Sequence, residues 1–226
     1  MYFIQKNLTR LKNNQSTFFL DPKELNEVKG KLKKNEYSIY YPYKDSEKNI
    51  IYKGNIPKVI LYEIIIKTEV RHQDILGSLY SLNIAPELFG DILIINGKYY
   101  LYVLDLIRNY LETNFLKVKN SSIELVERDL SLLEDYERKY EKLELIVSSN
   151  RIDTVVSTIC HTSRNVVPEM IKKKEIILNY DFLKDNSYKL KDNDVFSIKR
   201  IGKFKYTGVL KNTKSNHLII ELLKYI

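Results

Sequence analysis

The strongest local constraint on the fold is the dipeptide Asn96-Gly97, which separates the runs "GDILII" (90–95) and "KYYLYV" (98–103). Both runs are rich in β-branched and aromatic residues, as strands are. A two-residue hairpin turn of type I′ needs positive φ at both central residues, and asparagine and glycine accept that conformation most readily. The sequence therefore predicts an antiparallel hairpin centred on this dipeptide.

The segments around this hairpin indicate a βαββαβ order. We expect a strand in "KVILYEIIIK" (58–67), helices in "RHQDILGSLYSLN" (71–83) and "LDLIRNYLETNF" (104–115), and a last strand in "KNSSIELVE" (119–127). This is the order of a ferredoxin-like fold and of RNA-recognition modules, so the fold class is α+β. Tyr100 and Tyr102 share one strand face, where such modules display stacking aromatics. The "RGFGFV"-like signature is missing, so we favour core packing for both tyrosines.

Four regions are expected along the chain. They are an N-terminal α/β region (1–57), a central ferredoxin-like domain (58–127), a connector with a strand (128–150) and a C-terminal domain (151–226). In the first region Asp21 can cap a helix whose first position is Pro22. In the last region two helices, 151–162 and 163–174, precede short strands and a closing hairpin.

The positive charge is concentrated in the last region. Residues 151–226 hold 15 lysines and arginines against 8 aspartates and glutamates, whereas residues 1–150 hold 22 against 21. This asymmetry is typical of a polyanion-binding module on a neutral carrier. The alternative is a basic domain whose charges are only solvated.

Other classes of function have little support in the sequence. The single cysteine, Cys160, excludes an internal disulfide and a multi-cysteine metal site. There is no glycine-rich phosphate loop and no GxSxG motif, so we expect no cofactor, no metal and no catalytic residue. No apolar run approaches about 20 residues, and the N-terminus lacks the pattern of a signal peptide. We expect a cytoplasmic, monomeric protein that is not an enzyme.

The helix predicted from Ser163 carries the main candidate contacts. Ser163 can cap it, Arg164 can grip a phosphate with two hydrogen bonds, and Asn165 lies in the first turn, where free amides favour anions. The helix dipole favours a cation in the last turn, but not the mutually repelling run Lys172–Lys174. A phosphate backbone would neutralise that repulsion. Pro168 is expected to bend this helix.

Two further groups of basic residues are candidates. Lys199, Arg200, Lys203 and Lys205 are interleaved with Phe204 and Tyr206, as in a groove that tracks a backbone and stacks bases. The alternative is an edge hairpin protected by lysines. In the central domain, Arg71 and His72 begin a helix. They are either a second RNA contact or part of a capped helix with a structural Arg–Asp pair.

Four motifs resemble the S-four RNA-binding domain, also called the alpha-L motif: "RID" (151–153), "SR" (163–164), "MIKKKEIILN" (170–179) and "LKDNDV" (190–195). Members place glycine at the positions of Lys174, Tyr180 and Asn193. We also expect Arg151 and Asp153 to form a local pair. The RNA-binding candidates of this region are Arg151, Ser163, Arg164, Asn165, Lys172, Lys173, Lys174, Asn179, Lys199, Arg200, Lys203 and Lys205.

The blocks "FLDP" (19–22), "RHQDILGSL" (71–79), "GDIL" (90–93) and "SSNRID" (148–153) resemble the YlmH family. The resemblance implies a non-enzymatic protein that binds structured RNA (rRNA, with tRNA as a second candidate) on the large ribosomal subunit. It also implies a link to the rescue of stalled nascent chains and to cell division. The alternatives are an RNA-modifying enzyme with an S-four substrate-delivery domain and a protein-interaction adaptor linked to cell division.

Overall fold

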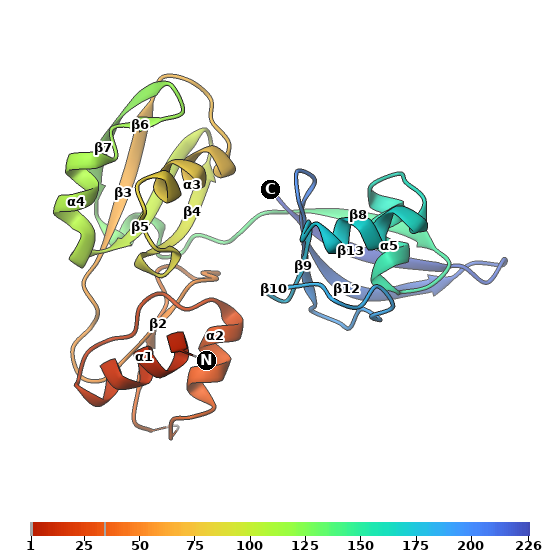
Figure 1. The fold of residues 1–226 in the computed structure, drawn as a ribbon, viewed down its shortest axis with the longest axis horizontal. Helices are drawn as coiled ribbons and strands as arrows, with labels where there is room; N and C mark the ends of the chain where they lie inside the picture. The colour runs from red at the N-terminus through yellow and green to blue at the C-terminus, as the bar shows by residue number, and fades with distance from the viewer. Residues whose placement is uncertain (1, 34) are drawn as a thin grey trace. The chain divides into compact units, whose positions relative to one another are not determined.

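The computed structural model describes residues 2–33 and 35–226. The chain forms two compact units, unit 1 up to Glu137 and unit 2 from Arg138 onward (Figure 1). Each unit combines helices with antiparallel sheet, so the α+β class is confirmed.

Unit 1 is built on a five-stranded antiparallel sheet with the strand order β4-β5-β3-β7-β6. Asn96 and Gly97 have φ values of 51° and 77°, so the predicted hairpin is confirmed. Helices α3 and α4 pack on one face of the sheet, where Ile75 and Leu111 meet the strands. The bounds are β3 (Val59–Ile66), α3 (His72–Ser81), β4 (Phe89–Ile95), β5 (Lys98–Leu104), α4 (Arg108–Asn114), β6 (Lys117–Val118) and β7 (Ser121–Arg128), with 3-10 turns at Pro86–Leu88, Asp105–Ile107 and Leu130–Leu133.

The N-terminal region covers the opposite face of this sheet. It contains α1 (Tyr2–Lys12), α2 (Pro22–Lys29), β1 (Ser38–Tyr40) and β2 (Ile50–Tyr52). Phe19 and Tyr43 pack against the strands, and the rings of Tyr43 and Tyr102 stack with centroids 5.9 Å apart. At Gly90 an added Cβ would lie 2.9 Å from the Phe19 ring and 3.0 Å from Cβ of Tyr102, so a larger residue would force one of these side chains to shift.

Tyr100 and Tyr102 therefore share a face, as predicted, and that face is a second core. The two side chains are 6% and 0% exposed. The expectation that they pack in a core rather than stack on bases is confirmed. In α2 the predicted cap is also confirmed, because Asp21 accepts from the amide of Glu24 and Glu24 accepts from the amide of Asp21.

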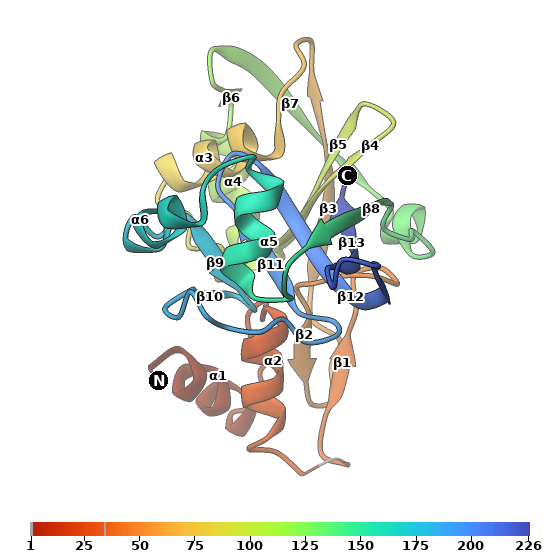
Figure 2. The same cartoon turned by 90° about the vertical axis from the view of Figure 1, so that its right-hand side faces the viewer.

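Unit 2 is a six-stranded antiparallel sheet with the order β10-β9-β11-β12-β13-β8. Helices α5 and α6 cover one face, and Figure 2 shows α5 in front of β11. The strand expected inside the 128–150 connector is β8, which pairs along its whole length with β13 and so belongs to this sheet. The bounds are β8 (Tyr140–Val147), α5 (Ile152–Ile159), a 3-10 turn (Arg164–Val166), α6 (Val167–Lys172), β9 (Ile176–Leu178), β10 (Asp181–Phe182), β11 (Val195–Ile198), β12 (Gly202–Asn212) and β13 (Leu218–Tyr225).

Two expectations for unit 2 are wrong. The single helix over 163–174 is a 3-10 turn followed by the six-residue α6, and Pro168 lies in the first turn of α6. The N–H groups of the first turn make no hydrogen bond within a helix, so a proline at this position does not bend α6. Phe204 and Tyr206 are 1% and 2% exposed, so they cannot stack on bases. The edge-hairpin alternative is wrong for Lys203 and Lys205, because this part of β12 pairs with β11 and, from Phe204 onward, also with β13.

The positions where S-four members carry glycine adopt left-handed backbone conformations here. Lys174, Tyr180 and Asn193 have φ values of 55°, 68° and 72°. At Lys174 the reason is the end of α6: its amide donates to Ile171 O at 2.9 Å, and the amide of Glu175 donates to Met170 O at 2.9 Å. This is a Schellman motif, whose left-handed residue is usually glycine.

Lys174→Gly should therefore raise the free energy of unfolding by about 1 kcal/mol, because a lysine pays a steric cost in this conformation that glycine does not. Urea unfolding, followed by circular dichroism, measures the change. Lys173→Gly is the matched control: it removes the same charge one residue earlier, where φ is −77°. It should lower stability by about 0.5 kcal/mol. Equal effects of the two variants would contradict the strain at Lys174.

Candidate nucleic-acid interface

The excess positive charge lies entirely in unit 2. Residues 138–226 hold 18 lysines and arginines against 10 aspartates and glutamates, whereas residues 1–137 hold 19 of each. A division of the sequence at residue 150 understates this contrast, because residues 138–150, with three lysines and arginines against two glutamates, also belong to unit 2. A polyanion is therefore attracted to unit 2 rather than to unit 1.

Two basic turns from distant parts of the chain meet at one end of the unit 2 sheet. The antiparallel register pairs Ile176 of β9 with Ile198 of β11, and the amide of Lys199 donates to Glu175 O at 2.9 Å. This places the turn after α6 beside the turn between β11 and β12. We call the resulting group of exposed cations the basic end; it consists of Lys173, Lys174, Lys199 and Arg200.

The basic end is not neutralised by the protein itself. Within the described ranges, none of its four side chains forms an ion pair. Lys174 Nζ lies 5.4 Å from the ring centroid of the half-exposed Phe182, which leaves its charge accessible. Four exposed cations that the fold does not pair are a suitable surface for phosphate groups.

Lys172 differs from the two lysines that follow it. Its Nζ lies 2.7 Å from Oε1 of Glu169, one turn earlier on α6. This hydrogen bond raises the pKa of Lys172 and lowers the pKa of Glu169, and both side chains are exposed. The predicted run of three lysines is therefore one ion-paired lysine and two lysines of the basic end.

Lys203 and Lys205 lie on the face of the sheet opposite α5, because they alternate with the buried Phe204 and Tyr206. Lys203 Nζ is 5.0 Å from the ring centroid of Tyr180 and 4.9 Å from that of Tyr225. The aromatic partners of Lys203 thus come from a turn and from β13, which the spacing of residues 203–206 does not indicate. Such cation–π contacts fix the position of the ammonium group.

Arg151 and Arg164 bind the same buried carboxylate. Nη2 of Arg151 and Nη2 of Arg164 lie 2.9 Å and 2.8 Å from Oδ2 of Asp153, whose side chain is 6% exposed. The predicted Arg151–Asp153 pair is confirmed. Arg164 is 46% exposed, so its remaining N–H groups still reach solvent. Ser163 accepts from the amide of Asn165 at 3.3 Å, as the predicted cap requires.

Asn179 holds two turns together. Its Nδ2 donates to Oδ1 of Asp194 at 2.8 Å, and its Oδ1 accepts from the amide of Val195 at 2.9 Å. Asp194 is 8% exposed and also accepts from the amide of Lys191. Through these bonds Asn179 positions the loop before β11, and its contact with RNA stays a prediction.

Arg71 and His72 lie at the start of α3 in unit 1. Arg71 is 74% exposed and lies 3.3 Å from Asp74, whose side chain is 7% exposed and also binds Lys119 at 2.8 Å. Hydrogen bonds from Arg71 and Lys119 hold the pKa of Asp74 well below its usual range. The structural Arg–Asp pair is thus present, and an RNA contact by Arg71 or His72 stays a prediction. No pattern in the sequence indicated that Lys119 would be the second partner of Asp74.

Across the described ranges there is no group of three or more side chains arranged to hold a metal ion. No helix in that part of the chain is long and apolar enough to cross a membrane. Cys160 is partly buried against the core of unit 2, and burial raises the pKa of its thiol.

The two-arginine site at Asp153 predicts acid sensitivity. Burial alone would raise the pKa of Asp153, but hydrogen bonds from Arg151 and Arg164 outweigh it and hold the pKa at about 2. Because the folded-state pKa is lowered, the stabilisation is present above pH ~4 and lost as the pH falls towards 2. Asp153→Asn should remove this part of the pH dependence and lower stability at pH 7 by about 1–3 kcal/mol.

Urea midpoints measured between pH 7 and pH 2 test this expectation. Asp185→Asn is the comparison, since Asp185 is an exposed carboxylate of the same unit that accepts hydrogen bonds from the neighbouring Ser187 and interacts with Arg151 more weakly than Asp153 does. A variant Asp153→Asn with the same acid profile as the wild type would contradict the role given to the two arginines.

Comparison with known proteins adds three findings. A family model described as "Putative RNA-binding domain in YlmH" matches residues 59–132. Ribosome-associated protein quality control protein P2 of Bacillus subtilis (strain 168) is 25% identical over 147 residues, which are 65% of this chain and 57% of that protein. The chain thus spans little more than half the length of this relative.

The solved structure of cell division protein ylmH from Streptococcus pneumoniae matches with a TM-score of 0.49 and 18% identity, covering 59% of this chain and 93% of that one. This likeness is too weak to support a fold assignment. The family model and the Bacillus relative support the relation to the YlmH family that the sequence blocks indicate, and they support an RNA-binding role.

Proposed function

We propose that this chain is a non-enzymatic RNA-binding protein that associates with ribosomal RNA of the large subunit and acts in the rescue or quality control of stalled translation. The observation that carries the proposal is the basic end, where Lys173 and Lys174 meet Lys199 and Arg200 without an ion pair among the described residues. The name of the Bacillus relative supports the ribosomal context. Transfer RNA is a second structured RNA that the same cations could bind. The protein is proposed to act in the cytoplasm as a monomer.

The assignment of unit 2 to the S-four class is part of this proposal. Two observations support it: the "RID" and "SR" motifs converge on Asp153, and residues at expected glycine positions adopt left-handed conformations. Unit 1 is proposed to be ferredoxin-like, since its strands follow the order β4-β5-β3-β7 with both helices on one face. Within this assignment, residues 151–226 with the added strand β8 form the RNA-binding domain.

The physical basis is electrostatic. Each lysine or arginine that neutralises a phosphate releases condensed counterions, so the logarithm of the binding constant falls with the logarithm of salt concentration by about 0.7–0.9 per contact. Double-stranded RNA is recognised through its shape and backbone rather than its base edges. A group of four cations on two adjacent turns suits that kind of recognition. Arg164 and Lys203 are further cations of the same unit.

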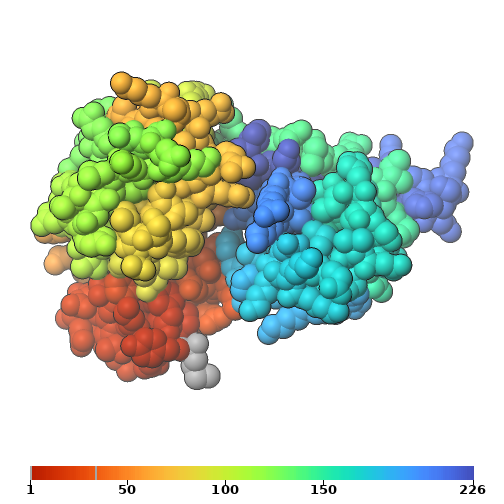
Figure 3. Space-filling model, turned by 45° about the horizontal axis from the view of Figure 1, so that its top comes forward, coloured from red at the N-terminus to blue at the C-terminus, as the bar shows by residue number. Residues whose placement is uncertain are grey.

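Co-sedimentation with large ribosomal subunits over a range of salt concentrations tests the proposal. The pair Lys173→Gln and Lys174→Gln should weaken binding at least tenfold and reduce the salt slope by about 1.5, because two phosphate contacts are lost. The matched control is the pair Lys211→Gln and Lys214→Gln, which removes the same charge at the tip of the β12–β13 hairpin. This tip projects from the body of unit 2 (Figure 3).

The two pairs lie at opposite ends of β12, whose 11 residues span about 35 Å. If both pairs weakened binding equally, net charge rather than the basic end would govern association. The non-enzymatic part of the proposal is tested separately: bare rRNA incubated with the chain should show no new modified nucleoside by mass spectrometry.

A further inference from the structure

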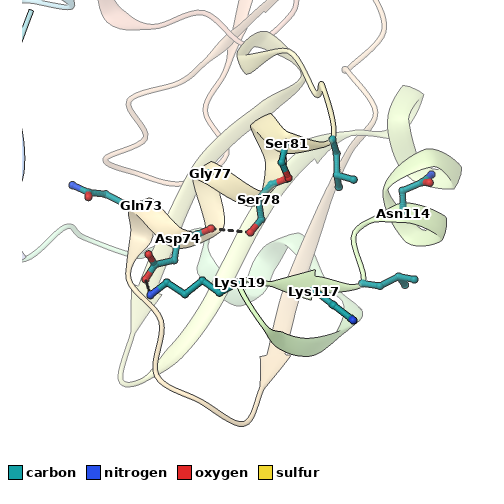
Figure 4. Close-up of a pocket in the computed structure, with 10 residues that line it drawn as sticks. Gln73, Asp74, Gly77, Ser78, Ser81, Asn114, Lys117 and Lys119 are labelled. Atoms are coloured by element: carbon teal, nitrogen blue, oxygen red, sulfur yellow. Dashed lines mark hydrogen bonds and ion pairs between the residues drawn. The ribbon is translucent and has the colours of Figure 1, made fainter.

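The stacking surface that RNA-recognition modules use is covered in unit 1. Tyr100 and Tyr102 of β5 lie under the N-terminal region, packed against Phe19 and Tyr43. If unit 1 contacts RNA, it does so through another surface. The helix side of the same sheet offers one, because a pocket of about 630 Å³ opens between α3 and the segment leading into β6 (Figure 4). This volume lies within the range of about 300–1,000 Å³ that is usual for ligand sites.

We propose that this pocket binds one unpaired ribonucleotide of an RNA strand. The inference rests on the proposed RNA-binding function and assigns a second contact site, on unit 1. The pocket is lined by Gln73, Asp74, Gly77, Ser78, Ser81, Leu82, Asn114, Leu116, Lys117 and Lys119.

The charge of the pocket favours a phosphate. Its carboxylate, Asp74, is 7% exposed and is already bound by Arg71 and Lys119, at 3.3 Å and 2.8 Å. Two cations therefore surround one buried anion. Lys117 adds a third cation, and it forms no ion pair within residues 2–33 and 35–226. The charged residues that line the pocket, Lys117, Lys119 and Asp74, carry a net charge of +1 although unit 1 as a whole is neutral. Arg71, which binds Asp74 from outside the lining, brings the local net charge to +2.

The hydroxyl groups of the pocket favour a ligand that also donates hydrogen bonds. Ser78 Oγ donates to Asp74 O at 2.9 Å, and Ser81 Oγ donates to Ser78 O at 2.7 Å. Because each hydroxyl hydrogen is already used, both oxygens are left with lone pairs to accept a hydrogen bond. A ribonucleotide combines a phosphate with such donors, namely the 2′-hydroxyl and base amino groups, and the 2′-hydroxyl distinguishes RNA from DNA.

Gly77 leaves the pocket wall open. A Cβ built at this position would have no heavy atom within 4 Å, so neither packing nor backbone conformation requires glycine here. Glycine inside a helix costs about 0.5–1 kcal/mol relative to alanine. A side chain at position 77 would project into the pocket, between Asp74 and Ser81 on the same flank of α3. This offers a variant that fills the pocket without harming the fold.

Fluorescence anisotropy of the full chain with a labelled single-stranded RNA and the DNA of the same sequence tests the inference. The wild type should prefer the RNA. Gly77→Leu and Lys117→Gln should each weaken RNA binding about fivefold to tenfold and abolish the preference over DNA. The control Lys58→Gln makes the same charge change as Lys117→Gln, on an exposed residue just before the first residue of β3. It should not change the affinity for RNA or the preference for RNA over DNA. Gly77→Leu should keep or raise the melting temperature.

The outcomes distinguish the pocket inference from the proposed RNA-binding function. If Gly77→Leu binds RNA like the wild type, or if the wild type does not distinguish RNA from DNA, the pocket inference is wrong while the proposed function stands. If the wild type binds no RNA, both are wrong. The Lys173→Gln and Lys174→Gln pair should weaken RNA and DNA alike, which separates the basic end from the pocket. If free adenosine monophosphate competes as well as the RNA at equal nucleotide concentration, the ligand is a free nucleotide, contrary to the inference.

Discussion

The organisation of unit 1 depends on the burial of both faces of its five-stranded sheet. Strand β3 contributes Ile60 and Tyr62 to the core under α3 and α4, and Leu61 to the core under the N-terminal region. A strand with apolar residues on both sides needs a cover on both sides, since exposed apolar area costs about 25 cal/mol per Å². Residues before 58 are therefore part of this fold rather than an appendage to it.

Polar contacts fix that cover in place. Lys48 Nζ donates to Pro86 O at 2.6 Å and to Phe89 O at 2.9 Å and lies 4.4 Å from the Phe89 ring centroid. Burial lowers the pKa of Lys48. Asp91 of β4 accepts from the hydroxyl of Tyr43 and from the amide of Glu47. These bonds satisfy buried polar groups at the junction, so the N-terminal region has one defined position on the sheet.

The local chemistry of the sequence predicted much of the structure, and the long-range pairing accounts for what it missed. Asn96-Gly97 and the Asp21 cap are local signals, and both were confirmed. The meeting of Lys174 with Lys199 depends on the register of β9 with β11, which no local pattern encodes. Alternation places Phe204 and Lys203 on opposite faces of β12, but only the complete sheet decides which face is buried. The pocket beside Gly77 follows no motif, since its lining comes from two segments of the chain.

The uneven division of charge between the units has a kinetic consequence. A polyanion's field acts on the net charge of unit 2, while unit 1 carries equal numbers of both signs. Encounter would then occur in two stages, a fast and salt-sensitive capture by unit 2 followed by a search by unit 1 within the same complex. In the second stage the covalent link between the units sets the local concentration of unit 1 near the RNA. A weak but selective contact at the pocket of unit 1 would in this way discriminate among RNAs that unit 2 has already bound.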